Sequence, residues 1–145
     1  MTALPQLRPT AAESLAKWHA MAAKGDFSEL QSIIQADVTF RSPVAYNAYK
    51  GADALVLAIS TVATVFQDFT YYRQAATADG LSAVLEFGAN VGGKEVKGID
   101  FIRFGEDGKI AEFEVMIRPL SGLQALSQEM GQRLGGKLPD HKENR

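Results

Sequence analysis

The stretch over residues 98–118 constrains the fold most, because it indicates two long strands joined by a tight turn. Apolar and polar residues alternate on both arms, and residues 105–108 between them are Gly-Glu-Asp-Gly, a pattern typical of a β-hairpin. Side chains of a strand point alternately to its two faces, so one face of each arm is predicted to be buried. This face carries Gly98, Asp100, Ile102, Phe104, Phe113, Val115 and Ile117.

Asp100 is the charged residue on this otherwise apolar face. A lone carboxylate there is costly unless it is hydrogen-bonded or kept neutral, which makes Asp100 the candidate catalytic residue. Two interpretations stay open, because perturbed acids occur in active sites and in structural networks alike. Asp100 is either a neutral acid that donates a hydrogen bond to a ligand carbonyl, enolate or hydroxyl group, or a structural carboxyl satisfied by Trp18, Ser42, a tyrosine or water.

Composition narrows the possible partners. The chain has 145 residues, enough for one domain, and its 15 Lys and Arg against 17 Asp and Glu give no basic excess for nucleic acid. It contains no cysteine, and its two histidines, His19 and His141, lie far apart in the sequence. We therefore expect no disulfide, no metal and no cofactor.

The sequence also lacks the usual signals for a membrane or for export. The N-terminus has neither the charged start nor the apolar segment of a signal peptide. The longest mostly apolar stretch, residues 52–66, is too short to span a bilayer. We expect a cytoplasmic protein with no membrane partner.

The chain order indicates helices first and a strand meander afterwards. Capping patterns at Thr10-Ala-Ala-Glu13 and Asp26-Phe-Ser-Glu29 predict two helices, and Gly51-Ala-Asp53 starts a third. The predicted helices cover residues 10–24, 26–35, 51–66 and about 120–134, and the predicted strands cover residues 38–42, 71–78, 81–91, 95–104 and 109–118. We expect one domain over 1–145, with a core over about 10–118 and a flexible tail over 135–145.

This order predicts an α+β fold, a cone in which three N-terminal helices pack on a highly curved, mostly antiparallel sheet. The strands are about ten residues long, which suits strong curvature, and the mouth of such a cone is a natural site for a ligand.

Several short motifs occur in a specific order and spacing. They are Trp18 to Gly25-Asp26, Ala36-Asp37-Val38-Thr39-Phe40, Ser42-Pro43-Val44, the helix that begins at Gly51, Ile99-Asp100-Phe101-Ile102-Arg103-Phe104, and Asp107-Gly108-Lys109-Ile110. In these motifs the chain resembles the nuclear transport factor 2-like superfamily, particularly its ketosteroid isomerase and SnoaL-like members, over about residues 10–118. The resemblance implies the fold, while the function stays open because this fold hosts unrelated tasks.

The isomerase site implied by this resemblance fits only in part. Asp100 matches the family's protonated acid, which an apolar site keeps neutral so that it donates a hydrogen bond. The family's tyrosine in the first helix corresponds to Trp18, whose indole N–H donates a hydrogen bond but exchanges no proton near neutral pH. The family's general-base aspartate corresponds to Ser42, which cannot shuttle a carbon-bound proton without an activating base.

Two other members of the superfamily also match incompletely. Epoxide hydrolases of the limonene type carry an arginine two residues before the aspartate, where this chain has Gly98. SnoaL-like polyketide cyclases carry an inward carboxylate on a late strand, whereas Glu112 and Glu114 lie on the outward face by alternation.

The sequence therefore leads to one main hypothesis about function. It is a small enzyme with an apolar pocket, acting as an isomerase, cyclase or dehydratase on a carbonyl-bearing or polycyclic compound, with Asp100 polarising an oxygen. The predicted ligand-binding residues are Trp18, His19, Phe40, Ser42, Tyr46, Leu85, Phe87, Ile102, Phe113 and Val115.

Two other interpretations stay open. In the first, the chain is a non-catalytic ligand-binding or dimerisation module that lacks the general base. In the second, which has the least support, it is a trafficking adaptor. Apolar residues on the outward face of the meander predict a homodimer through that face.

Overall fold

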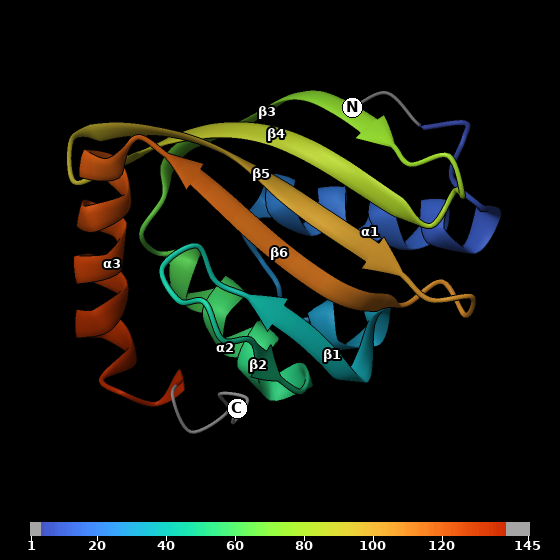
Figure 1. The fold of residues 1–145 in the computed structure, drawn as a ribbon, viewed down its shortest axis with the longest axis horizontal. Helices are drawn as coiled ribbons and strands as arrows, with labels where there is room; N and C mark the ends of the chain where they lie inside the picture. The colour runs from blue at the N-terminus through green and yellow to red at the C-terminus, as the bar shows by residue number, and fades with distance from the viewer. Residues whose placement is uncertain (1–3, 139–145) are drawn as a thin grey trace.

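The computed structural model describes residues 4–138. Figure 1 shows a curved sheet with helices on its concave side and one further helix at its end. The elements in chain order are α1 (Pro9–Lys24), the short 3-10 helix η1 (Leu30–Ile33), β1 (Ile34–Arg41), β2 (Tyr49–Lys50), α2 (Ala52–Val62), β3 (Gln67–Ala76), β4 (Ser82–Val91), β5 (Lys94–Phe104), β6 (Ile110–Arg118) and α3 (Leu120–Leu134).

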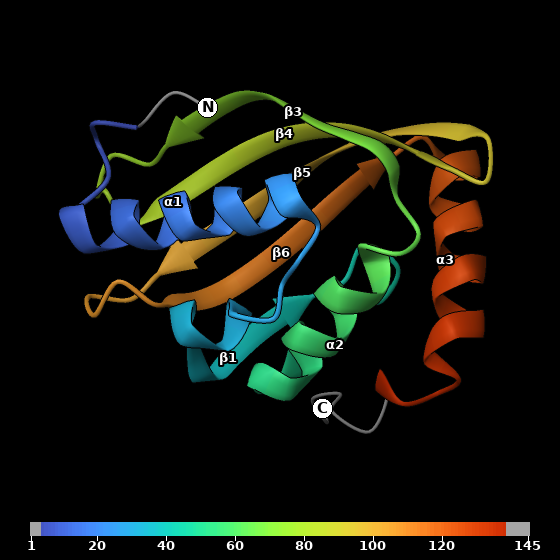
Figure 2. The same ribbon diagram turned by 180° about the vertical axis from the view of Figure 1, so that it is seen from behind.

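The six strands form one sheet in the order β2-β1-β6-β5-β4-β3. Strands β3 to β6 make an antiparallel meander, β1 is parallel to β6, and β2 is antiparallel to β1. Seen from behind, α1 and α2 lie on the same face of the sheet (Figure 2). The predicted α+β architecture is confirmed, and the sheet stays open, with β2 and β3 as its two edges.

The hairpin predicted from residues 98–118 is present as β5 and β6. On its buried face Asp100 pairs with Leu85 of β4 and with Val115 of β6. The pairing of β4 with β5 runs from Ser82 to Val91 without a register shift. Since alternation is uninterrupted here, Asp100 points to the core side, as the sequence predicts.

The first helix starts differently from the prediction. It begins at Pro9, with Arg8 as N-cap and no side-chain capping bond, so the predicted capping box at Thr10 is wrong. Proline at the first helical position loses no helical hydrogen bond, which explains this start. The helix ends at Lys24. Gly25 follows with a φ of 67°, and the backbone N–H groups of Gly25 and Asp26 donate hydrogen bonds to the carbonyl oxygens of Ala22 and Met21.

The second predicted helix, over residues 26–35, is also largely wrong. Only the single 3-10 turn of η1 forms, and β1 already begins at Ile34. The Asp26 carboxylate accepts a hydrogen bond from the backbone N–H of Ser28 at 3.0 Å, which makes a turn instead of a helix start. The short strand β2 is not predicted, because its two residues, Tyr49 and Lys50, are too few to show a strand pattern.

The core lies between the helices and the sheet, with a smaller cluster under α3. The smaller cluster attaches α3 to the ends of β4 and β5 through Val65, Ala89, Val91, Val96 and Leu126. Beyond α3, Leu138 is 6% exposed and belongs to the main core. Residues 139–145 of the expected flexible tail lie outside the described residues.

Candidate functional site

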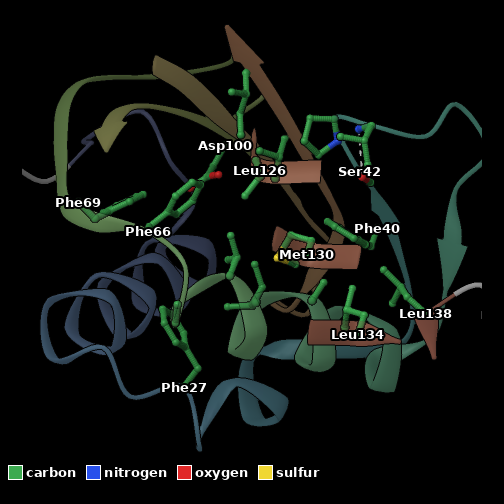
Figure 3. A pocket seen from close by; sticks show the side chains of 18 of the residues that line it. Phe27, Phe40, Ser42, Phe66, Phe69, Asp100, Leu126, Met130, Leu134 and Leu138 are labelled. Atoms are coloured by element: carbon green, nitrogen blue, oxygen red, sulfur yellow. Dashed lines mark hydrogen bonds between the residues drawn. The ribbon is translucent and has the colours of Figure 1, made fainter. Parts of the chain in front are cut away.

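A cavity of about 600 Å³ lies between α1, α2, α3 and the concave side of the sheet. In the view of Figure 3, Phe27, Phe66 and Phe69 lie on one side of this cavity and Phe40, Leu134 and Leu138 on the other. Its described lining is mostly apolar, and the polar or charged side chains in it are Trp18, Lys24, Ser42, Tyr49, Tyr71, Asp100 and Ser127. A largely apolar hollow with a few polar groups is typical of a small-molecule site.

One wall of the cavity is aromatic. The rings of Phe66 and Phe69 lie 5.7 Å apart, and Phe69 meets Tyr71 edge-on at 4.8 Å. On α1, Trp18 packs 5.2 Å from Phe27. Such a wall offers flat, rigid apolar surface to a ring system.

The opposite wall comes from α3. Leu126, Met130 and Leu134 recur every four residues and therefore face the cavity together. Ser127 and Gly131 follow them on the same side of the helix. The helix thus closes the cavity with its apolar stripe.

Asp100 is the carboxylate among the described lining residues of this cavity. It is 6% exposed, and its Oδ2 accepts a hydrogen bond of 2.6 Å from the hydroxyl of Tyr71. Burial raises the pKa of Asp100 to about 7, although the bond from Tyr71 opposes this rise by stabilising the charged form. Near neutral pH this group therefore exchanges between a neutral acid and a carboxylate.

Tyr71 is held in turn by Trp18. The indole Nε1–H of Trp18 donates a hydrogen bond of 2.9 Å to the hydroxyl oxygen of Tyr71. Burial and the nearby Asp100 raise the pKa of Tyr71 well above its ordinary value, so Tyr71 stays neutral and remains a donor. Trp18, Tyr71 and Asp100 form one chain of hydrogen bonds that ends at the cavity.

His19 lies behind this chain and outside the described cavity lining. Its ring meets the ring of Tyr71 edge-on at 5.2 Å. Burial lowers the pKa of His19, although a hydrogen bond with Gln74 opposes this shift. His19 therefore supports the packing of Tyr71.

The loop after β1 contributes Ser42 to the cavity, and its Oγ accepts a hydrogen bond of 3.1 Å from the backbone N–H of Val44. Tyr46 is 80% exposed and lies in a separate outer groove. Tyr49 is buried, stacks on Phe40 at 5.9 Å and lines the cavity. Of these two tyrosines, only Tyr49, on β2, lies in the described lining of the cavity.

The predicted ligand-binding residues therefore fall into three groups, and His19 and Tyr46, both outside the described cavity lining, form the first. Trp18, Phe40, Ser42 and Val115 line the cavity together with Asp100. Four others are fully buried in packed parts of the sheet and do not line it; they are Leu85, Phe87, Ile102 and Phe113. Alternation identifies the face to which a side chain points, but packing decides whether it meets a ligand or another side chain.

The sequence reasoning missed Tyr71, the aromatic pair Phe66 and Phe69, and the lining stripe of α3. The apolar spacing of Leu126 and Met130 was visible in the sequence, but nothing indicated that this stripe faces a cavity. Tyr71 lies next to a register shift between β3 and β4, which interrupts alternation between Tyr71 and Gln74.

Gly98 leaves no room for the arginine that limonene-type epoxide hydrolases carry there. A Cβ atom at this position would lie 2.8 Å from the ring of Phe87 and would also meet the backbone oxygen of Met116. The arginine of the limonene-type enzymes is therefore sterically excluded at position 98.

Within residues 4–138, His, Asp and Glu side chains form no group of three or more that could hold a metal ion. No helix of the described chain has the length and apolar character that a membrane crossing requires.

Comparison with known proteins gives both a family and solved relatives. A family model described as SnoaL-like domain matches residues 15–113. The crystal structure of a steroid delta-isomerase from Pseudomonas aeruginosa is 54% identical, with a TM-score of 0.89 over 94% of this chain and 98% of that chain. An uncharacterized protein with a cystatin-like fold from Silicibacter pomeroyi is 30% identical, with a TM-score of 0.81 over 90% of this chain and 94% of that chain.

The epoxide hydrolase/cyclase-like enzyme SalBIII, which is linked to pyran ring formation in salinomycin, is more distant. It is 18% identical, with a TM-score of 0.65 over 81% of this chain and 96% of that chain, and it shares the fold. No curated protein sequence matches the chain.

Proposed function

Because the chain belongs to the SnoaL-like domain family, we propose that it is a small enzyme that isomerises an apolar, carbonyl-bearing polycyclic compound. The observation that carries this proposal is a buried acid at the surface of a large apolar cavity: Asp100 is 6% exposed and has a pKa of about 7. The steroid delta-isomerase that is 54% identical supports the choice of isomerisation over cyclisation or dehydration.

In this proposal the neutral form of Asp100 donates a hydrogen bond to the carbonyl oxygen of the ligand. A water molecule in the cavity takes the proton from the carbon next to the carbonyl. The electron pair of the broken C–H bond then moves into the carbonyl, and negative charge develops on that oxygen. Return of a proton from this water to the far carbon of the double bond completes the isomerisation. A donor placed there in advance stabilises this enolate more than the starting ketone, which lowers the barrier. The aromatic wall with Phe66 and Phe69 would hold the rings of the compound, and α3 would shield the cavity from bulk solvent.

A second candidate function is binding without catalysis. It is favoured by one observation: among the described lining residues the cavity offers no second carboxylate besides Asp100, and Ser42 occupies the position of the family's general base. A binding module would hold the same class of compound and leave its double bond in place.

The test measures binding and turnover separately. Testosterone is the binding probe, and the Δ5 isomer of androstenedione is the substrate, whose isomerisation produces a conjugated enone with strong ultraviolet absorption. We expect Asp100→Asn and Asp100→Ala to abolish turnover, while Asp37→Asn, a change at an exposed aspartate of β1, leaves it intact. Full turnover in both Asp100 variants would overturn the enzymatic role, and binding without turnover in the wild type would establish the second candidate.

The same proposal includes a homodimer through the convex side of the meander. Tyr72 and Met116 are exposed there at 57% and 44%, and Phe101 is half-buried. A Met116→Lys variant would place a charge on this face without touching the core. Sedimentation analysis should then show a monomer for the variant and a dimer for the wild type; a wild-type monomer would contradict this part.

A further inference from the structure

The hydrogen bonds around Tyr71 have a fixed direction. An indole N–H can only donate, so the oxygen of Tyr71 must accept from Trp18 at 2.9 Å. The hydroxyl group of Tyr71 has a single hydrogen, and the geometry directs it to Oδ2 of Asp100 at 2.6 Å. Trp18 therefore determines which partner receives the hydrogen of Tyr71.

This direction has a consequence for the acid form of Asp100. The carbonyl oxygen of a carboxylic acid accepts hydrogen bonds better than its hydroxyl oxygen does. A donor fixed on Oδ2 therefore favours Oδ2 as the carbonyl oxygen and places the acidic proton on Oδ1. The proton then lies on Oδ1, which receives no hydrogen bond from Tyr71 and can donate to a ligand.

We propose that Tyr71 is a positioning residue, which acts through Asp100 by placing the acidic proton on Oδ1 and so presenting it to a ligand carbonyl. Trp18 supports this role by holding the hydroxyl group of Tyr71. The part that concerns the ligand rests on the proposed function. The placement of the proton rests on the hydrogen bonds alone and holds in the free protein.

The ring of Tyr71 is held independently of its hydroxyl group. Phe69, His19 and Phe87 meet it edge-on, with interplanar angles of 89°, 84° and 88°. These contacts fix the ring before any ligand arrives. A Tyr71→Phe variant keeps them and removes only the two hydrogen bonds.

Other titratable groups lie near this chain, and the test must separate them from Asp100. His19 packs against the ring of Tyr71, and Tyr49 and Lys24 line the cavity. Asp100→Asn leaves all of these groups in place. Subtracting its signal from that of each Asp100-containing protein therefore isolates the carboxyl group.

The first readout is the infrared C=O stretch of protonated Asp100 in the ligand-free protein, measured well below its pKa. In the wild type the carbonyl oxygen accepts a hydrogen bond, which lowers the stretching frequency. Tyr71→Phe should shift this band to higher wavenumber. Tyr72→Phe is the matched control, because Tyr72 follows Tyr71 on the same strand and is exposed.

The second readout is the pKa of Asp100 by carbon-13 NMR of the carboxyl group. The bond from Tyr71 lowers this pKa, so Tyr71→Phe should raise it. Trp18→Phe should shift both readouts in the same direction and by less, because Tyr71 then donates more weakly. If Tyr71→Phe does not fold, Trp18→Phe carries the test, since it keeps Tyr71.

The third readout is the pH profile of testosterone affinity, whose midpoint should move to higher pH in Tyr71→Phe. An unchanged band and an unchanged pKa in a folded Tyr71→Phe protein would overturn the inference, whatever the affinity does. The expected spectroscopic shifts in a protein that binds no testosterone would leave the placement of the proton standing and refute the proposed function.

Discussion

The hydroxyl of Tyr71 on β3 reaches across β4 to Asp100 on β5 and donates to it a hydrogen bond of 2.6 Å. Neighbouring strands lie about 4.8 Å apart, so two groups separated by a whole strand meet only when one side chain is long and the sheet bends toward it. Asp100 pairs with Leu85 of β4, and Tyr71 pairs with Phe87. Curvature therefore gives the buried acid its partner.

The raised pKa of Asp100 makes stability depend on pH. The unfolded chain releases this proton near pH 3.8, and the folded protein keeps it up to about pH 7, so stability falls as the pH rises between these values and then stays level. The separation of the two pKa values corresponds to roughly 4 kcal/mol. Asp100→Asn removes the effect and keeps an acceptor for Tyr71.

Urea unfolding at a series of pH values checks this prediction. The stability of Asp100→Asn relative to the wild type should grow by roughly 4 kcal/mol between about pH 4 and pH 7. The exposed change Asp37→Asn should show no comparable growth. A constant difference for Asp100→Asn would mean that its carboxyl group titrates alike in both states.

Ketone affinity should follow the protonation of Asp100. Only the neutral acid donates a hydrogen bond to a carbonyl oxygen, and the carboxylate repels it. Above pH 7 the neutral fraction falls about tenfold per pH unit, and testosterone affinity should fall with it until the apolar contacts alone remain. Calorimetric titration of the wild type against Asp100→Asn measures this, and a flat wild-type profile would contradict it.

The absence of a second acid in the described lining leads to a gain-of-function prediction. Ser42 lines the cavity, and Ser42→Asp would add a carboxylate that can take a proton from the carbon next to a ligand carbonyl. A positioned general base contributes roughly a hundredfold or more to rate. The Δ5 isomer of androstenedione should therefore be isomerised faster by Ser42→Asp and not by Ser42→Asn; equal rates in both would refute the role of this position.

Gly131, an exposed residue of α3, allows a side chain to be added at the edge of the cavity without disturbing the core. It lines the cavity from α3, and a Cβ atom there would meet no atom within 4 Å. Gly131→Ala should stabilise the protein by up to about 1 kcal/mol, because glycine is a poor helix former. Gly131→Phe should also fold, and it should lose more than tenfold in testosterone affinity, about 1.4 kcal/mol.

Thermal unfolding and ligand titration of both Gly131 variants separate the two effects. Gly131→Ala is the matched control, since it changes the helix and leaves the cavity nearly unfilled. Unchanged affinity in Gly131→Phe would show that the ligand does not reach this part of the cavity.

Asp100 and the hairpin around it could be predicted because alternation there is uninterrupted. The pairs of Asp100 with Leu85 and Val115 keep the register that the apolar pattern implies. Tyr71 could not be predicted, because its partner lies 29 residues away and the strand shifts register next to it. The local sequence pattern indicates the face of the sheet to which a side chain points. Whether two side chains from different strands meet depends on the curvature of the whole sheet.

The lining of the cavity was predictable only in part for a related reason. Phe113 and Val115 share a face by alternation, yet Phe113 is fully buried and Val115 lines the cavity. The prediction of a second helix over residues 26–35 was wrong because the 3-10 turn at residues 30–33 leads directly into β1. The pairing of β1 with β6 stabilises the extended chain there. Tertiary pairing overrides a local helix signal in such a case.

The carbon-13 NMR titration of the Asp100 carboxyl group, with and without testosterone and with Asp100→Asn to assign the signal, tests the central claim most directly. A buried acid that donates to a ligand should titrate near pH 7 in the free protein and higher in the complex, because the bound carbonyl stabilises the neutral form. A pKa near the ordinary 3.8 that does not change with testosterone would contradict the account.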